Sequence, residues 1–127
     1  MRKQHKAWFD GGSTPNPGIM KIGGFIQDPQ TIEIFRYSKT LAHGTNNEAE
    51  YKSLIFLLQE IVNLGIKKVS IYGDSQLVVN QVNGIFKTKD YRMKKLRREA
   101  RTLLSKIDRW NLHHIPRSKN KKADSLT

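Results

Sequence analysis

Alternating apolar and polar residues near the start of the chain predict β-strands. Ala7 and Phe9 fall on one side of a short extended stretch that ends in the carboxylate of Asp10, and a dense run of turn-forming residues, 11–18, follows it. Two more extended stretches are separated by the turn-forming pair Asp28-Pro29. The expected strands are Lys6–Asp10, Ile22–Gln27 and Thr31–Ser38. Their close succession predicts an antiparallel meander.

The apolar period changes to that of a helix after Thr45. The segment Thr45-Asn46-Asn47-Glu48 matches a capping box, in which the Thr45 and Glu48 side chains each satisfy a free backbone N–H. The stripe that continues at helical spacing consists of Leu54, Leu57, Leu58, Ile61 and Leu64. Gly65 is a natural end for this helix.

Shorter elements alternate along the second half of the chain. We expect a strand at Lys67–Gly73, a short helix at Ser75–Val82, a basic helix at Asp90–Ile107, a strand at Trp110–Pro116 and the start of a helix at Asn120–Leu126. The resulting order, βββαβααβα, predicts an α/β fold built on a mixed sheet with flanking helices.

Length and composition restrict the class of protein. The 127 residues correspond to one ordinary domain, expected to span 1–127. No apolar run approaches the roughly eighteen residues that cross a membrane, and the basic stretch Met1 to Lys6 lacks the apolar centre of a signal peptide. The absence of cysteine excludes disulfides and thiolate metal sites. A cytoplasmic protein with no membrane partner is expected.

The charge of the chain is concentrated in one segment. Residues 87–122 hold 14 Lys and Arg against 3 acids, whereas the rest of the chain holds 9 basic and 8 acidic residues. A local excess of this kind attracts polyanions, of which nucleic acid is favoured over an anionic membrane. The alternative is a solvated helix face with no partner.

Three acidic residues stand where an α/β sheet places its ligands. Asp10 and Asp74 each end a predicted strand. On a helical wheel Glu50 lies within about 40° of the leucine stripe, so it points inward, whereas Glu48 lies nearly opposite, on the solvent face. An inward carboxylate is costly unless it is paired by Arg, Lys or a divalent cation. Asp124, just inside the last predicted helix, joins the group by a weaker argument.

Each of these acids also has an ordinary explanation. An Asp at a strand end is commonly a turn former, and Asp74 with Ser75 can cap the helix that follows. A Glu beside a leucine stripe is commonly half exposed. Together, four hard oxygen ligands on a basic chain favour magnesium and phosphate chemistry.

Four short motifs occur in the order found in one known family. Together they span almost the whole chain. The first is Asp10-Gly11-Gly12-Ser13 with Asn16-Pro17-Gly18, and the second is Thr45-Asn46-Asn47-Glu48-Ala49-Glu50. The third is Tyr72-Gly73-Asp74-Ser75-Gln76, and the last is His114-Ile115-Pro116-Arg117 with Asn120-Lys121-Lys122-Ala123-Asp124. This set resembles the type 1 ribonucleases H, in the short form found in many archaeal and bacterial members.

The resemblance implies a ribonuclease H-like fold, a five-stranded mixed sheet flanked by helices, and cleavage of the RNA strand of an RNA–DNA hybrid. It implies two Mg²⁺ ions, or Mn²⁺ as a substitute, held by Asp10, Glu50, Asp74 and Asp124. One ion would activate a water for in-line attack and the other would stabilise the leaving 3′ oxygen, giving 5′-phosphate and 3′-hydroxyl ends.

The same resemblance implies which residues contact substrate. They are Gly11, Ser13, Asn16, Thr45, Asn46, Asn47 and Gln76, with Thr45 as part of a phosphate pocket. Uncharged groups suit a shallow minor groove that is read through 2′-hydroxyls and base edges. A monomer is expected.

The chain departs from the longer bacterial members in three places. The loop after the last strand has no histidine, so Arg117 is the candidate catalytic substitute, with a phosphate contact or a salt bridge as its alternative. His114 is expected to pack on the sheet. No tryptophan-bearing basic protrusion is present, so the basic helix after Asp90 is expected to contact phosphates instead. The chain ends three residues after Asp124, which predicts a short final helix, as in a truncated domain.

Other functions remain open on the sequence. A relative that also cuts double-stranded RNA would share this fold. A catalytically weak or silent nucleic-acid-binding module would be expected to have lost a carboxylate, and all four are present. In a basic structural protein of the ribosomal type, the inward Glu50 would have no purpose.

Overall fold

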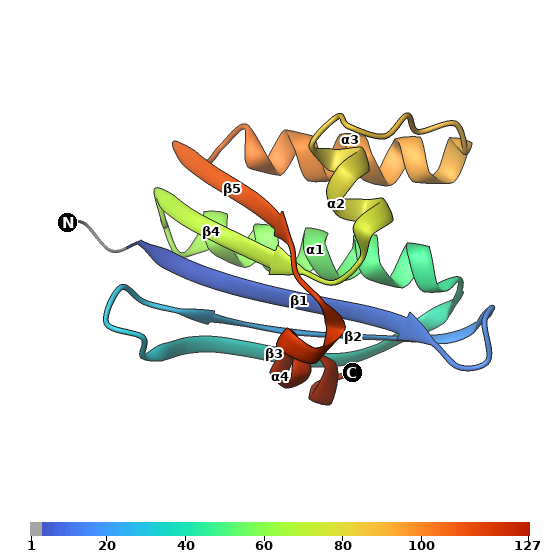
Figure 1. Cartoon of the computed structure of the whole chain (residues 1–127), viewed down its shortest axis with the longest axis horizontal. Helices are drawn as coiled ribbons and strands as arrows, with labels where there is room; N and C mark the ends of the chain where they lie inside the picture. The colour runs from blue at the N-terminus through green and yellow to red at the C-terminus, as the bar shows by residue number, and fades with distance from the viewer. Residues whose placement is uncertain (1–3) are drawn as a thin grey trace.

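The computed structural model describes residues 4–127 and forms a five-stranded sheet with helices on both faces (Figure 1). The strands are β1 (His5–Ser13), β2 (Gly18–Gln27), β3 (Glu33–Gly44), β4 (Lys68–Gly73) and β5 (Arg109–His114). The helices are α1 (Asn46–Asn63), α2 (Gln76–Val82), α3 (Tyr91–Leu104), the 3₁₀ turn η1 (Arg117–Lys119) and α4 (Lys121–Ser125). Within this part of the chain no helix is both long and apolar enough to cross a membrane.

The sheet combines an antiparallel and a parallel half. The strand order is β3-β2-β1-β4-β5, with β2 antiparallel to both β1 and β3, and with β4 parallel to both β1 and β5. The parallel half matters most for function because the carboxyl ends of β1 and β4 meet at the same edge of the sheet. The predicted element order and mixed sheet are confirmed.

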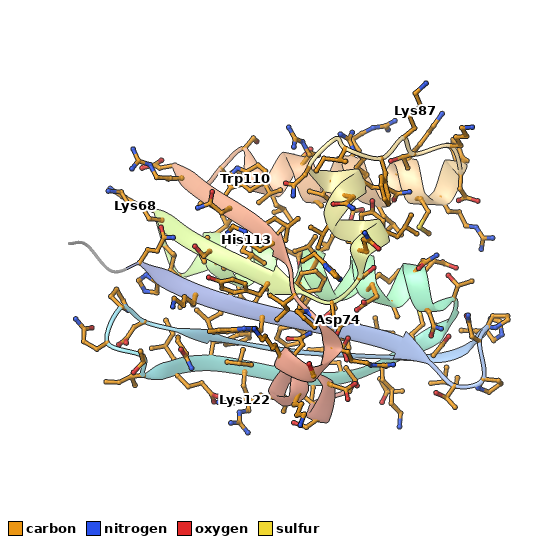
Figure 2. The ribbon with its side chains drawn as sticks, viewed as in Figure 1. Lys68, Asp74, Lys87, Trp110, His113 and Lys122 are labelled. Carbon is orange, nitrogen blue, oxygen red and sulfur yellow. The ribbon has the colours of Figure 1, made fainter. Side chains whose placement is uncertain are left out.

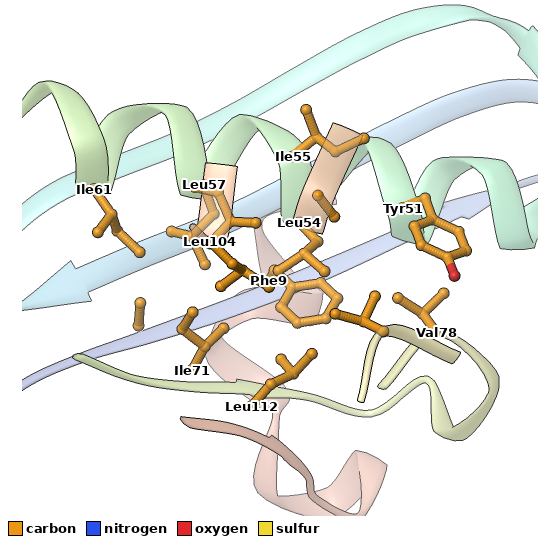
Figure 3. Packing of buried hydrophobic residues seen from close by; sticks show 14 of the residues in the cluster. Phe9, Tyr51, Leu54, Ile55, Leu57, Ile61, Ile71, Val78, Leu104 and Leu112 are labelled. Atoms are coloured by element: carbon orange, nitrogen blue, oxygen red, sulfur yellow. The ribbon is translucent and has the colours of Figure 1, made fainter. Parts of the chain in front are cut away.

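The main core lies between the sheet and α1. Phe9, Ile71 and Leu112 project from three adjacent strands toward α1, whose inward residues include Leu54 and Leu57 (Figure 3). Helix α3 packs beside α1 and adds Leu104 to the same cluster. These side chains are nearly or completely buried, so their transfer from water supplies much of the driving force that holds α1 against β1.

The opposite face of the sheet carries a row of stacked rings. Trp8 on β1 stacks on Phe25 of β2 at 4.6 Å between ring centroids and on Tyr72 of β4 at 5.3 Å, and Tyr72 stacks on His113 of β5 at 5.4 Å. Cross-strand aromatic pairs of this kind stabilise strand register. Helix α4 lies on this face, across β1 and β2 (Figure 1).

Several element boundaries differ from those expected. Strands β1, β2 and β3 extend beyond the alternating segments, because residues 11–13, 18–21 and 39–44 continue the ladder into the expected loops. The prediction that the first strand ends at Asp10 is therefore wrong: β1 continues to Ser13. Helix α3 ends at Leu104 rather than Ile107, and α4 is limited to five residues. The strands are longer than expected because their backbones continue to pair with a neighbouring strand. The alternation of residues along a single strand carries no information about such pairing.

Gly11 allows the first turn of α1 to approach β1 very closely. A Cβ at position 11 would lie 2.4 Å from the Ala49 carbonyl oxygen and 2.8 Å from the Glu50 nitrogen. These are backbone atoms, which cannot rotate away. At Gly12 the nearest atom would be Asn46 Oδ1 at 3.6 Å, an ordinary contact. A side chain at position 11 would therefore push α1 away from β1, whereas a side chain at position 12 would fit.

Replacing Gly11 by Ala should force α1 away from β1, with a loss of about 1–3 kcal/mol in the free energy of unfolding, typical of overpacking in a fixed backbone. Gly12→Ala is the matched control and should change it by much less. Urea unfolding of both variants without metal measures the difference. Equal stability of the two variants would show that α1 does not depend on this approach.

Candidate metal centre

Three carboxylates meet beside the carboxyl end of β4. Phe9 of β1 and Gly73 of β4 are register partners in the parallel pair, so Asp10 and Asp74, the next residues, lie side by side, although β1 continues to Ser13 and Asp10 stays paired with Gly23 of β2. Glu50 reaches them from the first turns of α1, which Gly11 allows to approach. One oxygen from each of the three side chains lies within 4.8 Å of the other two.

Burial makes this arrangement electrostatically costly. Asp10 is 4% exposed and Glu50 7%. Burial, followed by the neighbouring carboxyl of Asp124 and the charge of Asp74, raises the pKa of Asp10 to about 7. Burial, and then the charges of Asp10 and Asp74, raises the pKa of Glu50 well above its ordinary value. Without a cation, these groups therefore resist ionisation.

The donor set fits a divalent cation. Glu50 Oε1 is buried and has no hydrogen-bond partner among the described residues, which is expensive for a carboxylate unless a positive charge binds it. The three residues offer only hard oxygen ligands, the type that Mg²⁺ and Mn²⁺ prefer. The geometry thus supports a metal-binding function for this cluster.

Asp124 comes from the opposite face of the sheet. It lies on α4, is exposed, and is close enough to Asp10 to raise its pKa. It is not a member of the group of three whose oxygens lie within 4.8 Å of one another. The structure therefore brings three of the four predicted carboxylates into one cluster and places the fourth beside it.

A cavity of about 650 Å³ opens over the carboxylates. Its lining includes Asp10, Gly11, Ser13, Asn46, Asn47, Glu50, Asp74, Arg117 and Asp124 from the predicted set, together with Gly12, Thr14, Ile19, Lys21, Ser75 and Thr127. Asn16, Thr45 and Gln76 are not part of the lining. Gln76 is exposed at the first turn of α2, next to the lining residue Ser75.

Asn16 and Thr45 act on the cavity through their neighbours. Asn16 Oδ1 accepts a hydrogen bond of 3.0 Å from the Asn46 backbone N–H, and Asn46 Oδ1 accepts one of 2.7 Å from the Ser13 N–H. Thr45 caps α1, with Glu48 N–H donating to Thr45 Oγ1 at 3.1 Å and the Thr45 N–H donating to Glu48 Oε1 at 3.3 Å. The predicted capping box is confirmed.

Two side chains lie elsewhere than expected. Glu48 is not on the solvent face: its side chain is 14% exposed and pairs with Arg92 of α3 at 3.4 Å. The helical wheel could not anticipate that α3 packs there. His114 does not pack on the sheet but is exposed at the end of β5, and it is His113 that stacks on Tyr72 (Figure 2).

Sequence reasoning missed the role of Asn120 as an anchor. This residue is 1% exposed, and its Nδ2 donates to the Phe9 carbonyl at 3.0 Å and to Asp74 Oδ2 at 3.1 Å. It therefore ties the segment before α4 to β1 and orients one of the clustered carboxylates. The signal available in the sequence was its place in the last motif, four residues before Asp124.

Comparison with known proteins agrees with this geometry. The family described as "Reverse transcriptase-like" matches residues 8–127. The chain is 37% identical over 120 residues to ribonuclease HI of Halobacterium salinarum, covering 94% of this chain and 60% of that protein. The crystal structure of RNase H1 from that archaeon superposes with a TM-score of 0.93 at 36% identity and covers 96% of this chain and 92% of that one. The chain belongs to the type 1 ribonuclease H family.

Two further relatives show how widely this ribonuclease H domain is used. The bifunctional protein Rv2228c of Mycobacterium tuberculosis is 37% identical over 118 residues, which are 92% of this chain and 32% of that protein. LC11-RNase H1 in complex with an RNA/DNA hybrid gives a TM-score of 0.90 at 30% identity, covering 97% of this chain and 93% of that one. The chain spans about 60% and about a third of the lengths of the two curated relatives named here.

The raised pKa values predict how the stability of this chain depends on pH in the absence of metal. Between the ordinary carboxyl pKa near 4 and about 7, the folded protein keeps protons on Asp10 and Glu50 that the unfolded chain releases. The free energy of unfolding should therefore fall as pH rises from 5 to 8, by at most about 1.4 kcal/mol per pH unit for each proton. Glu33, whose pKa is lowered to about 2, stays ionised throughout this window.

The measurement is urea unfolding in EDTA at pH 5 and pH 8. Asp10→Asn removes one of the two groups, so its stability should fall less over this range, and at pH 8 it should equal or exceed the wild type. Saturating Mn²⁺ should abolish the decline in the wild type. A wild-type stability that rises from pH 5 to pH 8 in EDTA would contradict the assigned cause.

Proposed function

We propose that this chain is an endoribonuclease that hydrolyses the RNA strand of RNA–DNA hybrids and leaves 5′-phosphate and 3′-hydroxyl ends. The observation that carries the proposal is the buried cluster of Asp10, Glu50 and Asp74, with an unpartnered Glu50 oxygen, at the floor of an open cavity. A cluster of this kind has no structural use without a cation, because its like charges only destabilise the fold.

Two divalent ions, Mg²⁺ with Mn²⁺ as a substitute, are the proposed cofactors, held by Asp10, Glu50, Asp74 and Asp124. When bound, such ions supply a hydroxide nucleophile at neutral pH and stabilise charge on the leaving oxygen. The chain's own contribution is to hold the ligands: Asn120 orients Asp74, and α1 holds Glu50 against Asp10.

The uncharged residues in the lining of the cavity suit the minor groove of a hybrid. The side-chain oxygen of Asn46 accepts a hydrogen bond from the Ser13 N–H. Its NH₂ group has no acceptor within residues 4–127, so this group can donate to substrate. We assign substrate contacts to Gly11, Ser13, Asn16, Thr45, Asn46, Asn47 and Gln76. Arg117, exposed on the rim, is placed to bind a phosphate and is proposed to assist catalysis in place of a loop histidine.

A second, basic groove is proposed to contact phosphates of the same duplex. It lies between α3 and the loop before this helix, where Figure 2 labels Lys87, and has a volume of about 810 Å³. Its basic lining residues are Lys87, Lys94, Arg97, Arg98 and Arg101. Arg97 and Arg101 donate to the carbonyls of Gln81 and Val82 at 2.7 and 2.8 Å. Lys94 and Arg98 make no such recorded bond within the described chain, so they are the better phosphate contacts.

Monomeric state and cytoplasmic location remain predictions of the sequence. The activity of a complete protein is likewise part of the proposal, because the curated relatives named above are longer than this chain.

Cleavage of three labelled duplexes, a hybrid, an RNA duplex and a DNA duplex, tests the proposed function. With Mg²⁺ or Mn²⁺ the RNA strand of the hybrid should be cut, and EDTA should abolish cutting. Glu50→Gln should lower the rate by several orders of magnitude because it removes a ligand charge. Glu48→Gln, the matched control two residues away, should keep most of the rate. Because Gln can still accept the Thr45 N–H, this variant should lose only about 0.3–1 kcal/mol of stability, through the missing negative charge at the start of α1 and beside Arg92.

The outcomes of this assay separate the competing functions. Cutting of the RNA duplex at a similar rate would make the chain a broader ribonuclease. Hybrid binding without cutting would identify a silent binding module. Full activity in EDTA, or inactivity of Glu48→Gln with an active Glu50→Gln, would reject the assigned metal ligands.

The basic groove predicts a salt dependence of hybrid affinity. Each phosphate contact adds about one unit to the slope of log affinity against log salt, so Lys94→Gln with Arg98→Gln should flatten it by about two units. Lys67 is an exposed lysine just before β4 and outside the groove, so Lys67→Gln, which removes a single charge, is compared with each single variant and should leave the slope unchanged. Fluorescence anisotropy in Ca²⁺ or EDTA measures binding without cleavage. A slope that the double variant does not alter would assign these charges to solubility.

A further inference from the structure

Helix α4 carries Asp124 but is too short to hold itself in place. It has five residues, and no side chain caps its N-terminus. A single helical turn is unstable alone, since nucleation costs more than so few hydrogen bonds return. The position of Asp124 therefore depends on what α4 contacts.

The inner side of α4 is anchored by packing and by Asn120. Ala123 is completely buried. Leu126 packs directly on β2 at Gly23, where a Cβ would lie 2.6 Å from Leu126 Cβ, and the Leu126 carbonyl accepts a hydrogen bond from the Ser38 hydroxyl. These contacts hold the two ends of the helix.

Lys122, labelled in Figure 2, adds contacts with two further strands. Its Nζ forms an ion pair with Glu33 Oε1, at the start of β3, and lies 4.4 Å from the centroid of the Phe25 ring on β2. Glu33 is itself fixed by Arg36, whose Nε and Nη2 donate to the two carboxylate oxygens at 2.8 and 3.1 Å. Lys122 thus bridges β2 and β3 from a position two residues before Asp124.

The seat of Lys122 is rigidly connected to the metal centre. Phe25 is the first ring of the row in which Trp8 and Tyr72 follow, at centroid separations of 4.6 and 5.3 Å. Trp8 and Tyr72 stand two residues before Asp10 and Asp74 on β1 and β4. Helix α4 rests on β1 and β2, and β1 presents Asp10, so the row of rings joins the seat of Lys122 to one strand of the metal centre directly and to β4, which precedes Asp74, through Tyr72.

We infer that Lys122, through its ion pair with Glu33 and its seat on Phe25, is a positioning residue that places Asp124 as the fourth metal ligand. The inference rests on the proposed metal centre and deepens it. Its consequence is that loss of the bridge appears first in metal affinity, while hybrid affinity is retained.

Two other roles for Lys122 give different results. A lysine that only stabilises the fold would, when replaced, lower the thermal midpoint of the metal-free protein and leave metal affinity unchanged. A lysine that only binds substrate phosphate would raise the KM for hybrid and flatten the salt slope, again with metal affinity unchanged.

The decisive comparison is Lys122→Met against Lys121→Met, measured by calorimetric titration of the whole chain with Mn²⁺ alone. Lys121 is exposed on the same helix, and no ion pair is recorded for it among the described residues. Each variant removes one positive charge near the acidic cluster, which by Coulomb's law favours cation binding. We expect Lys121→Met to bind Mn²⁺ as well as the wild type or better, and Lys122→Met to bind it roughly three- to ten-fold more weakly.

Variants at the other end of the bridge complete the test. Glu33→Gln should weaken Mn²⁺ binding like Lys122→Met, and the double variant should be no weaker than either single one, because both remove the same interaction. Arg36→Met, which removes the other partner of Glu33, should have much less effect. Equal Mn²⁺ affinity in Lys122→Met and Lys121→Met, or additive losses in the double variant, overturns the inference.

A failure of the proposed nuclease function can be told apart from a failure of the inference on Lys122. A wild type that binds Mn²⁺ but cuts no hybrid rejects the nuclease assignment and leaves the comparison of Lys122 with Lys121 fully readable. A wild type that binds no Mn²⁺ overturns both.

Discussion

The close approach of α1 to β1 at Gly11 is the constraint on which the rest of the site depends. A helix normally stands off a strand by the length of side chains, but here the backbone at Ala49 and Glu50 comes within 3 Å of where a Cβ would be. That approach brings the Glu50 carboxylate beside Asp10 and removes both from water. The raised pKa values, the unpartnered oxygen and the metal-binding potential all follow from it.

Burial of apolar side chains in the main core offsets the electrostatic cost of the clustered carboxylates. The cluster around Phe9, Leu54 and Ile71 is continuous from the sheet through α1 to α3, and burial of each large apolar side chain contributes about 1.5–3 kcal/mol. The cost is confined to one edge, where the strands end and a cavity admits solvent and ions. A site of this kind is pre-organised, because the fold holds the carboxylates of Asp10, Glu50 and Asp74 together before any cation binds.

The sequence predicted the parts of the fold that depend on local pattern. Helical spacing turned Glu50 inward and the end of β4 placed Asp74, because both are consequences of backbone geometry along one element. Asp10 was expected at a strand end, but pairing with β2 carries β1 on to Ser13. Residues whose function depends on a second element were not predictable in this way. The wheel placed Glu48 in solvent, but α3 brings Arg92 to it; Asn120 and Lys122 acquire their contacts only when the last segment crosses the sheet.

The small size of α4 affects how easily Asp124 can lose its position at the site. The three clustered carboxylates sit on elements fastened by the main core, whereas Asp124 sits on one turn of helix held by a few surface contacts. Small, weakly packed elements open locally far more often than a core unfolds. Of the four carboxylates, Asp124 is therefore the one whose position can be lost at the smallest cost in free energy, without disturbing the sheet, the rings or α1.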